Sequence, residues 1–125
     1  MRLLLDTHVF LWCVRDDRRL TKSIRALIAG ANEVYVSGAS IWEVAIKQRL
    51  GKLEVDIDQL VLAISRSGFI ELPVTARHAA AVSRLPDLHR DPFDRLLVAQ
   101  ALSEPLRFLT ADSALQQYSN LVEAV

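Results

Sequence analysis

Acidic side chains stand at the positions of this sequence that are best suited to chemistry. Asp6 directly follows the apolar run Leu3 to Leu5, and Glu43, Asp94 and Asp112 each lie near the start of a helical pattern. Carboxylates that converge repel one another unless a cation or a proton lies between them. Because no cluster of cysteines or histidines accompanies them, the pattern favours Mg²⁺ or Mn²⁺ over zinc. Such an ion commonly activates water next to a phosphate, so the predicted reaction is phosphodiester hydrolysis.

Short apolar runs alternate with helical patterns along the chain. The clearest helical pattern begins at Pro92, which suits the first helical position, with Asp91 before it as an N-cap. Strands that alternate with helices predict an α/β fold, in which a mostly parallel sheet is covered by helices on both faces. We expect strands at residues 2–5, 34–36, 69–72, 107–109 and 121–122, and helices at residues 9–14, 23–29, 39–50, 60–64, 76–83, 92–102 and from 112.

This topology brings the four acids to one edge of the sheet. Parallel α/β sheets bind ligands outside the carboxyl ends of their strands. Asp6 ends the first expected strand, Glu43 lies in the first turn of the helix that leaves the second, and Asp112 follows the fourth. Asp94 lies near the N-terminus of a helix that runs antiparallel to the strand that follows it. The start of that helix, and Asp94 with it, therefore lies at the same edge as the carboxyl ends of the strands. The sequence therefore predicts one acidic site at this edge.

Each acid also has a purely structural interpretation. Asp6 and Asp112 are good N-caps for the helices that follow them. Ser40 and Glu43 match the S-x-x-E capping box, and Asp94 suits the first turn of a helix, where it meets the positive end of the dipole. Caps are needed wherever helices begin, whereas these acids all converge on one edge, and that convergence favours a functional interpretation.

Composition limits the architecture and the possible partners. With 125 residues, 51% of them hydrophobic, and a mean hydropathy of +0.21, the chain predicts one domain spanning residues 1–125. Its net charge is +0, so a site for a polyanion has to be local.

The lone Cys13 suggests a reducing cytoplasm. Asp6 interrupts the first apolar run, which argues against a signal peptide, and no run is long enough for a membrane span.

Four ordered motifs resemble those of a known family. They read LLLDTHVFLW at residues 3–12, SIWEVAIKQRLGKL at 40–53, HRDPFDRLLVAQA at 89–101 and LTAD at 109–112. Together they resemble the PIN-domain ribonucleases, and within that group most closely the VapC-type toxins of bacterial toxin–antitoxin pairs. The resemblance covers essentially the whole chain, and four motifs in order are far more specific than any single acid.

The resemblance implies a fold, an activity and partners. The fold would be a three-layer α/β/α sandwich whose central parallel sheet has four or five strands. The activity would be a Mg²⁺- or Mn²⁺-dependent endoribonuclease that cuts RNA, inhibited by a small cognate antitoxin, in a protein that forms a homodimer.

The resemblance also assigns roles to individual residues. Asp6 and Asp94 would be the principal metal ligands, Glu43 would bind the metal or orient water, and Asp112 would complete the cluster. Asp91, three residues before Asp94, would be a secondary ligand or a cap. The hydroxyls of Thr7 and Thr110 would hydrogen-bond to the metal ligands and orient them.

Contacts to RNA and to the antitoxin are less sharply indicated. Arg95, adjacent to Asp94, is the strongest candidate for an RNA-binding residue, although any single cation more commonly belongs to an ordinary solvated surface. Trp12 belongs either to the core or to a groove for an antitoxin helix. His8 and His89 either assist proton transfer or support the site, and His78 is expected to pack in the core. Other candidate cations are Lys47, Arg49, Lys52, Arg90 and those at residues 15–19.

Two other functions remain open. A haloacid-dehalogenase-like phosphatase also places an aspartate after its first parallel strand, but the run Asp6-Thr7-His8 lacks the second aspartate expected two positions later. A catalytically inactive PIN-like binding module is the other alternative, and the presence of all four acids argues against it. RNA cleavage that requires a metal and is abolished by Asp6→Asn or Asp94→Asn separates a nuclease from the binding module. Hydrolysis of a small phosphate ester without RNA would instead support the phosphatase.

Overall fold

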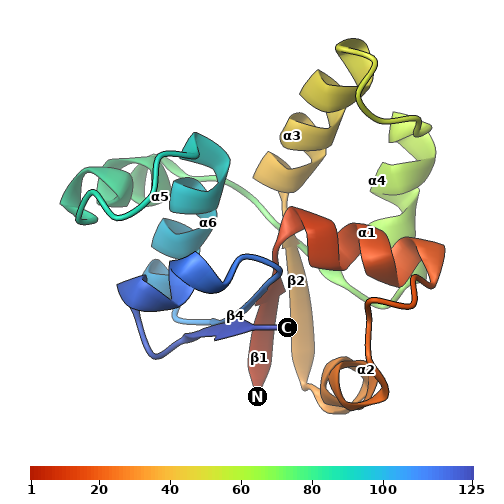
Figure 1. The fold of residues 1–125 in the computed structure, drawn as a ribbon, viewed down its shortest axis with the longest axis horizontal. Coiled ribbons are helices and arrows are strands. Elements are labelled where there is room, and N and C mark those ends of the chain that lie inside the picture. Colours follow the sequence, from red (N-terminus) through yellow and green to blue (C-terminus); the bar gives the residue numbers. More distant parts are fainter.

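The computed structural model describes residues 1–125, and every strand and helix expected from the sequence is present, with ends shifted by a few residues. The expected helix at 76–83 divides into a short α-helix and a 3₁₀ turn. The strands are β1 (Arg2–Leu5), β2 (Glu33–Ser37), β3 (Ile70–Leu72), β4 (Arg107–Thr110) and β5 (Val122–Ala124) (Figure 1). The helices are α1 (Thr7–Arg15), α2 (Lys22–Gly30), α3 (Gly38–Arg49), α4 (Ile57–Arg66), α5 (Ala76–Ala81) and α6 (Pro92–Ser103), with 3₁₀ turns η1 (Val82–Arg84) and η2 (Ser113–Tyr118).

The five strands form one sheet in the order β3-β2-β1-β4-β5, and every neighbouring pair is parallel. β1 lies at the centre, so Leu3 faces Val34 on one side and Arg107 on the other. The α/β fold with a parallel sheet is therefore confirmed. With β1 and β4 adjacent, the residues that follow both strands lie at the same sheet edge.

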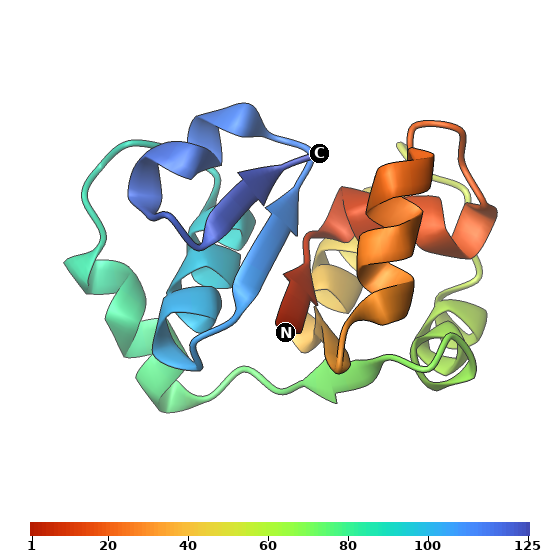
Figure 2. The same cartoon turned by 90° about the horizontal axis from the view of Figure 1, so that it is seen from below.

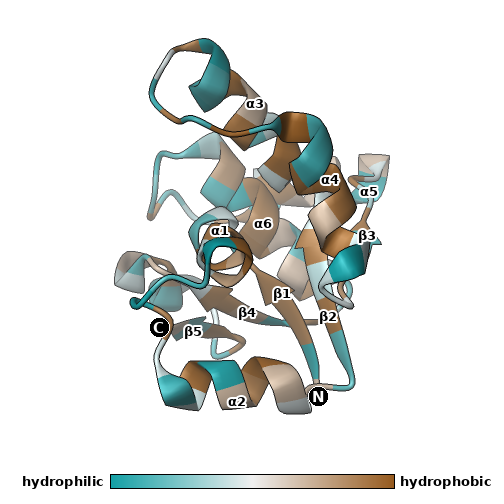
Figure 3. Cartoon of the chain, turned by 90° about the vertical axis from the view of Figure 1, so that its right-hand side faces the viewer, coloured by the Kyte–Doolittle hydropathy of each residue, from teal (hydrophilic) through white to brown (hydrophobic).

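Successive leucines of β1 enter opposite layers of the core. Leu3 and Leu5 pack in a cluster with residues of α1 and α4, whereas Leu4 packs in a second cluster with residues of α6 and η2. Figure 2 shows these two groups of helices on either side of the sheet. In Figure 3, β1 is hydrophobic along most of its length, as expected for a strand covered on both faces. The domain is thus the three-layer α/β/α sandwich that the resemblance implies.

The start of α3 differs from the prediction. Its N-cap is Ser37, the last residue of β2, whose hydroxyl accepts a hydrogen bond from the backbone N–H of Ala39. Ser40 lies inside the helix, so the predicted capping box between Ser40 and Glu43 is wrong, and Glu43 lies beyond the first turn. The reason is that the strand leads directly into the helix, and the residue at that junction provides the cap.

His78 packs in the core, as predicted, and connects α5 to α6. Its side chain is 1% exposed, and its Nδ1 accepts the backbone N–H of Thr75. The remaining ring N–H, on Nε2, is therefore the donor to Glu104 Oε2 at 2.5 Å. The first bond belongs to the N-cap of α5, whereas the second joins α5 to Glu104, the C-cap of α6, which is the helix that carries Asp94. None of the helices is long and apolar enough to cross a membrane.

Candidate active site

Asp6 links three elements at the carboxyl end of β1. Its side chain is 3% exposed, and Oδ1 accepts the backbone N–H of Val9 at 2.7 Å, which caps α1. Oδ2 accepts from the hydroxyl of Thr110 and from the N–H of Ala111, both at 2.7 Å. Burial raises the pKa of Asp6, although these three donors favour its ionised form. Three of its roughly four acceptor positions are used, which leaves one for a further ligand.

Glu43 reaches the same region from α3 and is held by groups on both sides. Its side chain is buried, and Oε1 accepts a hydrogen bond from the hydroxyl of Thr7 at 2.7 Å. Its other oxygen, Oε2, lies 2.9 Å from Nζ of Lys47, one helical turn further along α3. The Thr7 hydroxyl is also 3.0 Å from that of Ser40, so a buried side chain of α1 positions the acid on α3.

Asp94 differs from the other acids because its carboxylate accepts no hydrogen bond. The side chain is 24% exposed, and its nearest cationic or donor group is His89, with Nε2 3.9 Å from Oδ2. Burial raises the pKa of Asp94 to about 7, with further contributions from the negative charges of Asp91, Glu43 and Asp6. A half-buried carboxylate among other acids, without a donor, is the arrangement that a bound cation would stabilise most.

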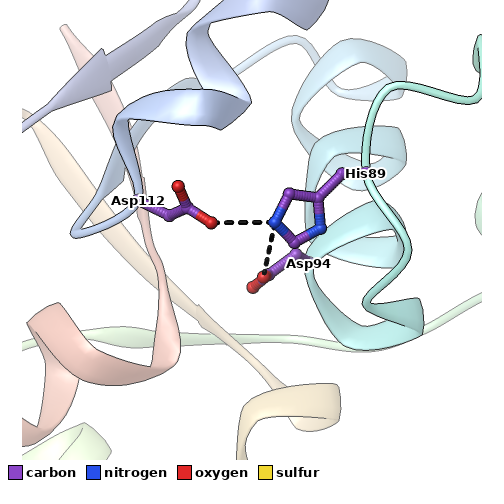
Figure 4. Close-up of side chains that lie close together, drawn as sticks. All are labelled: His89, Asp94 and Asp112. Atoms are coloured by element: carbon purple, nitrogen blue, oxygen red, sulfur yellow. Dashed lines mark hydrogen bonds and ion pairs between the residues drawn. The ribbon is translucent and has the colours of Figure 1, made fainter.

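Asp112 and His89 complete the cluster (Figure 4). His89 Nδ1 accepts the backbone N–H of Asp91, so the ring hydrogen lies on Nε2, 2.8 Å from Asp112 Oδ2. The other oxygen of Asp112 caps η2 through the N–H of Ala114. Single ligand atoms of His89, Asp94 and Asp112 lie within 4.8 Å of one another, a spacing at which one ion can contact several of them.

One cavity joins these groups at the carboxyl ends of β1 and β4. It is lined by Asp6, His8, Asp94, Ala111, Asp112 and Ser113. Glu43 does not line this cavity, but its negative charge contributes to the raised pKa of Asp94. The structure brings three of the four predicted acids, Asp6, Asp94 and Asp112, to one cavity. The donor set there, mainly carboxylate oxygens, fits a hard divalent cation. The roles assigned to individual acids remain predictions.

Structural and functional interpretations coexist at several of these acids. Asp6 and Asp112 are N-caps and also line the cavity. Asp91 caps α6 by accepting the N–H groups of Phe93 and Asp94, whereas its role as a secondary ligand stays a prediction. His89, which the sequence indicated either for proton transfer or for support of the site, lies in a supporting position, because both ring nitrogens form hydrogen bonds, one with Asp112 and one with the backbone of Asp91.

Arg95 lies in surroundings that favour a structural role. Its side chain is 14% exposed, and its Nη1 donates to the carbonyl of Pro86 and to the hydroxyl of Tyr118, both at 3.0 Å. Its Nη2 donates to the carbonyl of Val82. Contact with RNA, as predicted from the sequence, would require some of these bonds to break. The guanidinium instead ties the segment before α6 to the 3₁₀ turn η2.

The fold and the cavity define the class of this protein, an α/β/α domain with a carboxylate-rich site at the carboxyl ends of its central parallel strands. The model of the PIN domain family matches residues 3–121. The chain belongs to the PIN-domain family.

Known proteins resemble the chain over nearly its full length. Ribonuclease VapC22 of Mycobacterium tuberculosis is 28% identical over 118 residues, which cover 93% of this chain and 91% of that protein. The VapBC2 structure from Rickettsia felis, bound to a DNA fragment from the promoter, matches with a TM-score of 0.73 at 18% identity, covering 99% of this chain and 98% of that one. A toxin–antitoxin complex from Klebsiella pneumoniae matches with a TM-score of 0.67 at 19% identity, covering 97% and 95%. At these identities the structural similarities establish the fold alone.

Proposed function

We propose that this protein is a metal-dependent endoribonuclease and the toxin of a toxin–antitoxin pair. One observation carries the proposal. The carboxylate of Asp94 is half-buried, accepts no hydrogen bond and lies close enough to Asp6 and Glu43 for their charges to raise its pKa. The relative named as a ribonuclease and the toxin–antitoxin structures of the same fold support the assignment. The four acids together account for a site that attracts a cation and, through it, a phosphate.

Asp6, Asp94 and Asp112 would hold Mg²⁺ or Mn²⁺, with Glu43 as a further ligand or as the group that orients water. When bound, the ion would supply an activated water and would neutralise charge on the phosphate. The surrounding side chains fix the geometry of the ligands: Thr110 holds Asp6, Thr7 holds Glu43, and His89 holds Asp112.

The partners follow from the surface as well as from the resemblance. Ile46 of α3 and its C-cap Leu50 are exposed, as are Val61 and Leu62 of α4, which supports an apolar contact with an antitoxin. Trp42 is 61% exposed and packs against Phe93, so it offers an apolar face for a second copy of the chain. We therefore include an antitoxin complex and a homodimer in the proposal, acting on RNA in the cytoplasm.

The decisive test is cleavage of total RNA by antitoxin-free protein with Mg²⁺, with a chelator, and by an Asp94→Asn variant whose fold is verified by circular dichroism. We expect cuts at discrete sites only for the wild type with metal. Folded, metal-loaded wild type that cuts none of the RNAs would indicate the inactive binding module. Hydrolysis of a small phosphate monoester without cleavage of RNA would indicate the phosphatase.

A further inference from the structure

A second cavity lies beside the acidic one, between α1, the far half of α3 and the loop after α3. We call it the basic groove. Four of its lining side chains are cationic, whereas none is acidic. It is lined by Thr7, His8, Leu11, Trp12, Arg15, Arg19, Val44, Lys47, Lys52 and Leu53. For a chain with a net charge of +0, this is a strong local concentration of positive charge.

Two of the four cations are free for a ligand. Arg19 pairs with Asp17 at 2.7 Å, and Lys47 pairs with Glu43 at 2.9 Å. Arg15 and Lys52 form no ion pair, and the only hydrogen bond of the Arg15 side chain is to the carbonyl of Glu54 at 3.3 Å. The groove therefore contains two cations without an ion-pair partner, although the charge of Arg15 also acts on nearby Asp17.

An aromatic surface lies among these cations. Trp12 is partly exposed, and the guanidinium carbon of Arg19 lies 5.1 Å from the centroid of its ring. A guanidinium stacked on an indole is a common platform for nucleobases, because any base can stack on it regardless of sequence. An acidic peptide would use the cations but would gain little from this platform, so the pairing favours a nucleic acid.

The groove lies next to the acidic cavity. His8 lines both, and Thr7, which lines the groove, donates to Glu43. From Thr7 to Arg15 the helix α1 rises by about 12 Å, at roughly 1.5 Å per residue. One strand of duplex DNA rises about 3.4 Å along the helix axis per nucleotide, so this length corresponds to about three nucleotides of a stacked strand and to fewer of an extended one. In Figure 1, α1 leads away from the end of β1 along this path.

We propose that the basic groove binds the backbone of a few nucleotides of single-stranded RNA next to the scissile phosphate. Arg15 and Lys52 contact phosphates, and a base stacks on the platform of Trp12 and Arg19. The proposal rests on the proposed nuclease function, because that function places a phosphate in the adjacent acidic cavity. Beyond the nuclease function, the groove defines which side of the molecule the RNA strand follows and which residues determine the affinity for RNA.

Binding is measured first, with an Asp94→Asn protein that leaves the RNA intact. A fluorescent twelve-nucleotide single-stranded RNA is titrated against this protein and against the same protein carrying Arg15→Gln and Lys52→Gln. We expect the double substitution to weaken binding about tenfold and to reduce the slope of log K against log salt by about 1.4, or about 0.7 for each lost phosphate contact. The matched control replaces two exposed cations elsewhere, Lys22 and Arg77, by glutamine and should change neither quantity.

Cleavage then separates this proposal from the function on which it rests. Arg15→Gln with Lys52→Gln should raise KM for the twelve-nucleotide RNA about tenfold, with little change in kcat or in cleavage of a dinucleotide too short to fill the groove. Wild type that cuts no RNA would overturn the nuclease itself. Wild type that cuts RNA, with a double variant of unchanged KM and affinity, would overturn the groove alone, as would a double variant that lost affinity only for a glutamate-rich peptide.

Trp12 provides a third, spectroscopic measurement. The chain has two tryptophans, so Trp42→Phe leaves Trp12 as the only one. We expect RNA to quench its fluorescence with the same midpoint as in the binding titration, and expect that midpoint to rise about tenfold after Arg15→Gln and Lys52→Gln. Emission that stays unchanged at saturating RNA would show that no base reaches the platform.

Discussion

The acidic cavity and the basic groove meet at His8, yet they are built in opposite ways. At the acidic cavity, Asp6 in its lining and Glu43 nearby are 3% and 5% exposed, and both accept short hydrogen bonds from threonine hydroxyls. In the groove, Arg15 and Lys52 are exposed and almost unconstrained. A catalytic metal ion requires ligands whose positions are fixed by packing, whereas attraction of a flexible polyanion such as RNA requires only cationic side chains near its path.

A similar contrast exists inside the acidic cavity. Asp6 accepts three hydrogen bonds, whereas Asp94 accepts none, and burial raises the pKa of both. Asp6 is therefore stabilised by the protein itself, and Asp94 depends on a proton or a cation. The following experiments test these two contrasts.

The largest effect is expected from Asp94→Asn. Because this substitution removes a charge but keeps the shape of the side chain, we expect RNA cleavage to fall by about 10³-fold or more, with the fold unchanged by circular dichroism. Arg77→Gln, on exposed α5, is the control and should keep wild-type activity. An Asp94→Asn protein that cuts RNA at the wild-type rate would remove Asp94 from the reaction.

Stability without metal should depend on pH through Asp94. The pKa of Asp94 is raised from 3.8 to about 7, so between these values the folded chain holds a proton that the unfolded chain has released. The free energy of unfolding should therefore decrease as the pH rises through this window, on the order of a few kcal/mol, and level off above it. Urea denaturation at pH 5 and at pH 8, both with a chelator present, measures this difference in the free energy of unfolding.

Two additions sharpen this test. Asp94→Asn removes the titrating group, so its stability should vary much less between pH 5 and pH 8 than that of the wild type. Mg²⁺ should restore wild-type stability at pH 8, because the ion binds the ionised carboxylate in the folded state only. Wild-type stability that rises between pH 5 and pH 8 in chelator would contradict the raised pKa.

Removal of a supporting hydroxyl should have a smaller effect. Thr110→Val keeps the side-chain volume but deprives Asp6 of one donor, so we expect Mg²⁺ affinity by calorimetry and RNA cleavage to fall about 10- to 100-fold. The same loss is expected for Thr7→Val through Glu43. The control is Ser65→Ala, where the lost hydroxyl bonds only to a carbonyl of exposed α4. Equal effects in all three variants would mean that the hydroxyls do not act through the acids.

The smallest effect tests the cap of α3. Ser37→Ala removes the observed N-cap and should lower the free energy of unfolding by about 1 kcal/mol. Ser40→Ala leaves the cap intact and should act mainly on the position of Thr7 and Glu43, hence on metal affinity. Chemical denaturation and calorimetry of the two variants separate these outcomes. If Ser40→Ala lowered the free energy of unfolding more than Ser37→Ala, Ser40 would be the cap, as the capping box predicted from the sequence requires.

Much of the fold could be predicted from local pattern. The continuous apolar run at Leu3 to Leu5 is typical of a strand covered on both faces, and these leucines are fully buried. Pro92 after Asp91 marked the start of α6, where both residues lie as expected. The alternation of strands and helices predicted a parallel sheet, which in turn predicted that Asp6, Glu43, Asp94 and Asp112 share one edge.

Other features depended on contacts between distant residues. Ser40 fits a capping box in sequence, but tertiary packing places it inside α3 against Thr7. Arg95 lies beside an acid of the site, yet its donors reach carbonyls and a hydroxyl on other segments. The basic groove combines cations from α1, α3 and two loops, and no sequence window contains them.

The sequence by itself determined which residues form strands and helices and which acids follow them, because hydrophobic periodicity and capping act over a few neighbouring residues. Only the tertiary structure decided which carboxylate lacks a hydrogen bond, where the ring of His89 lies, and which cations face a cavity. These properties depend on burial and on donors supplied from positions up to 105 residues away, as in the bond from Ala111 to Asp6.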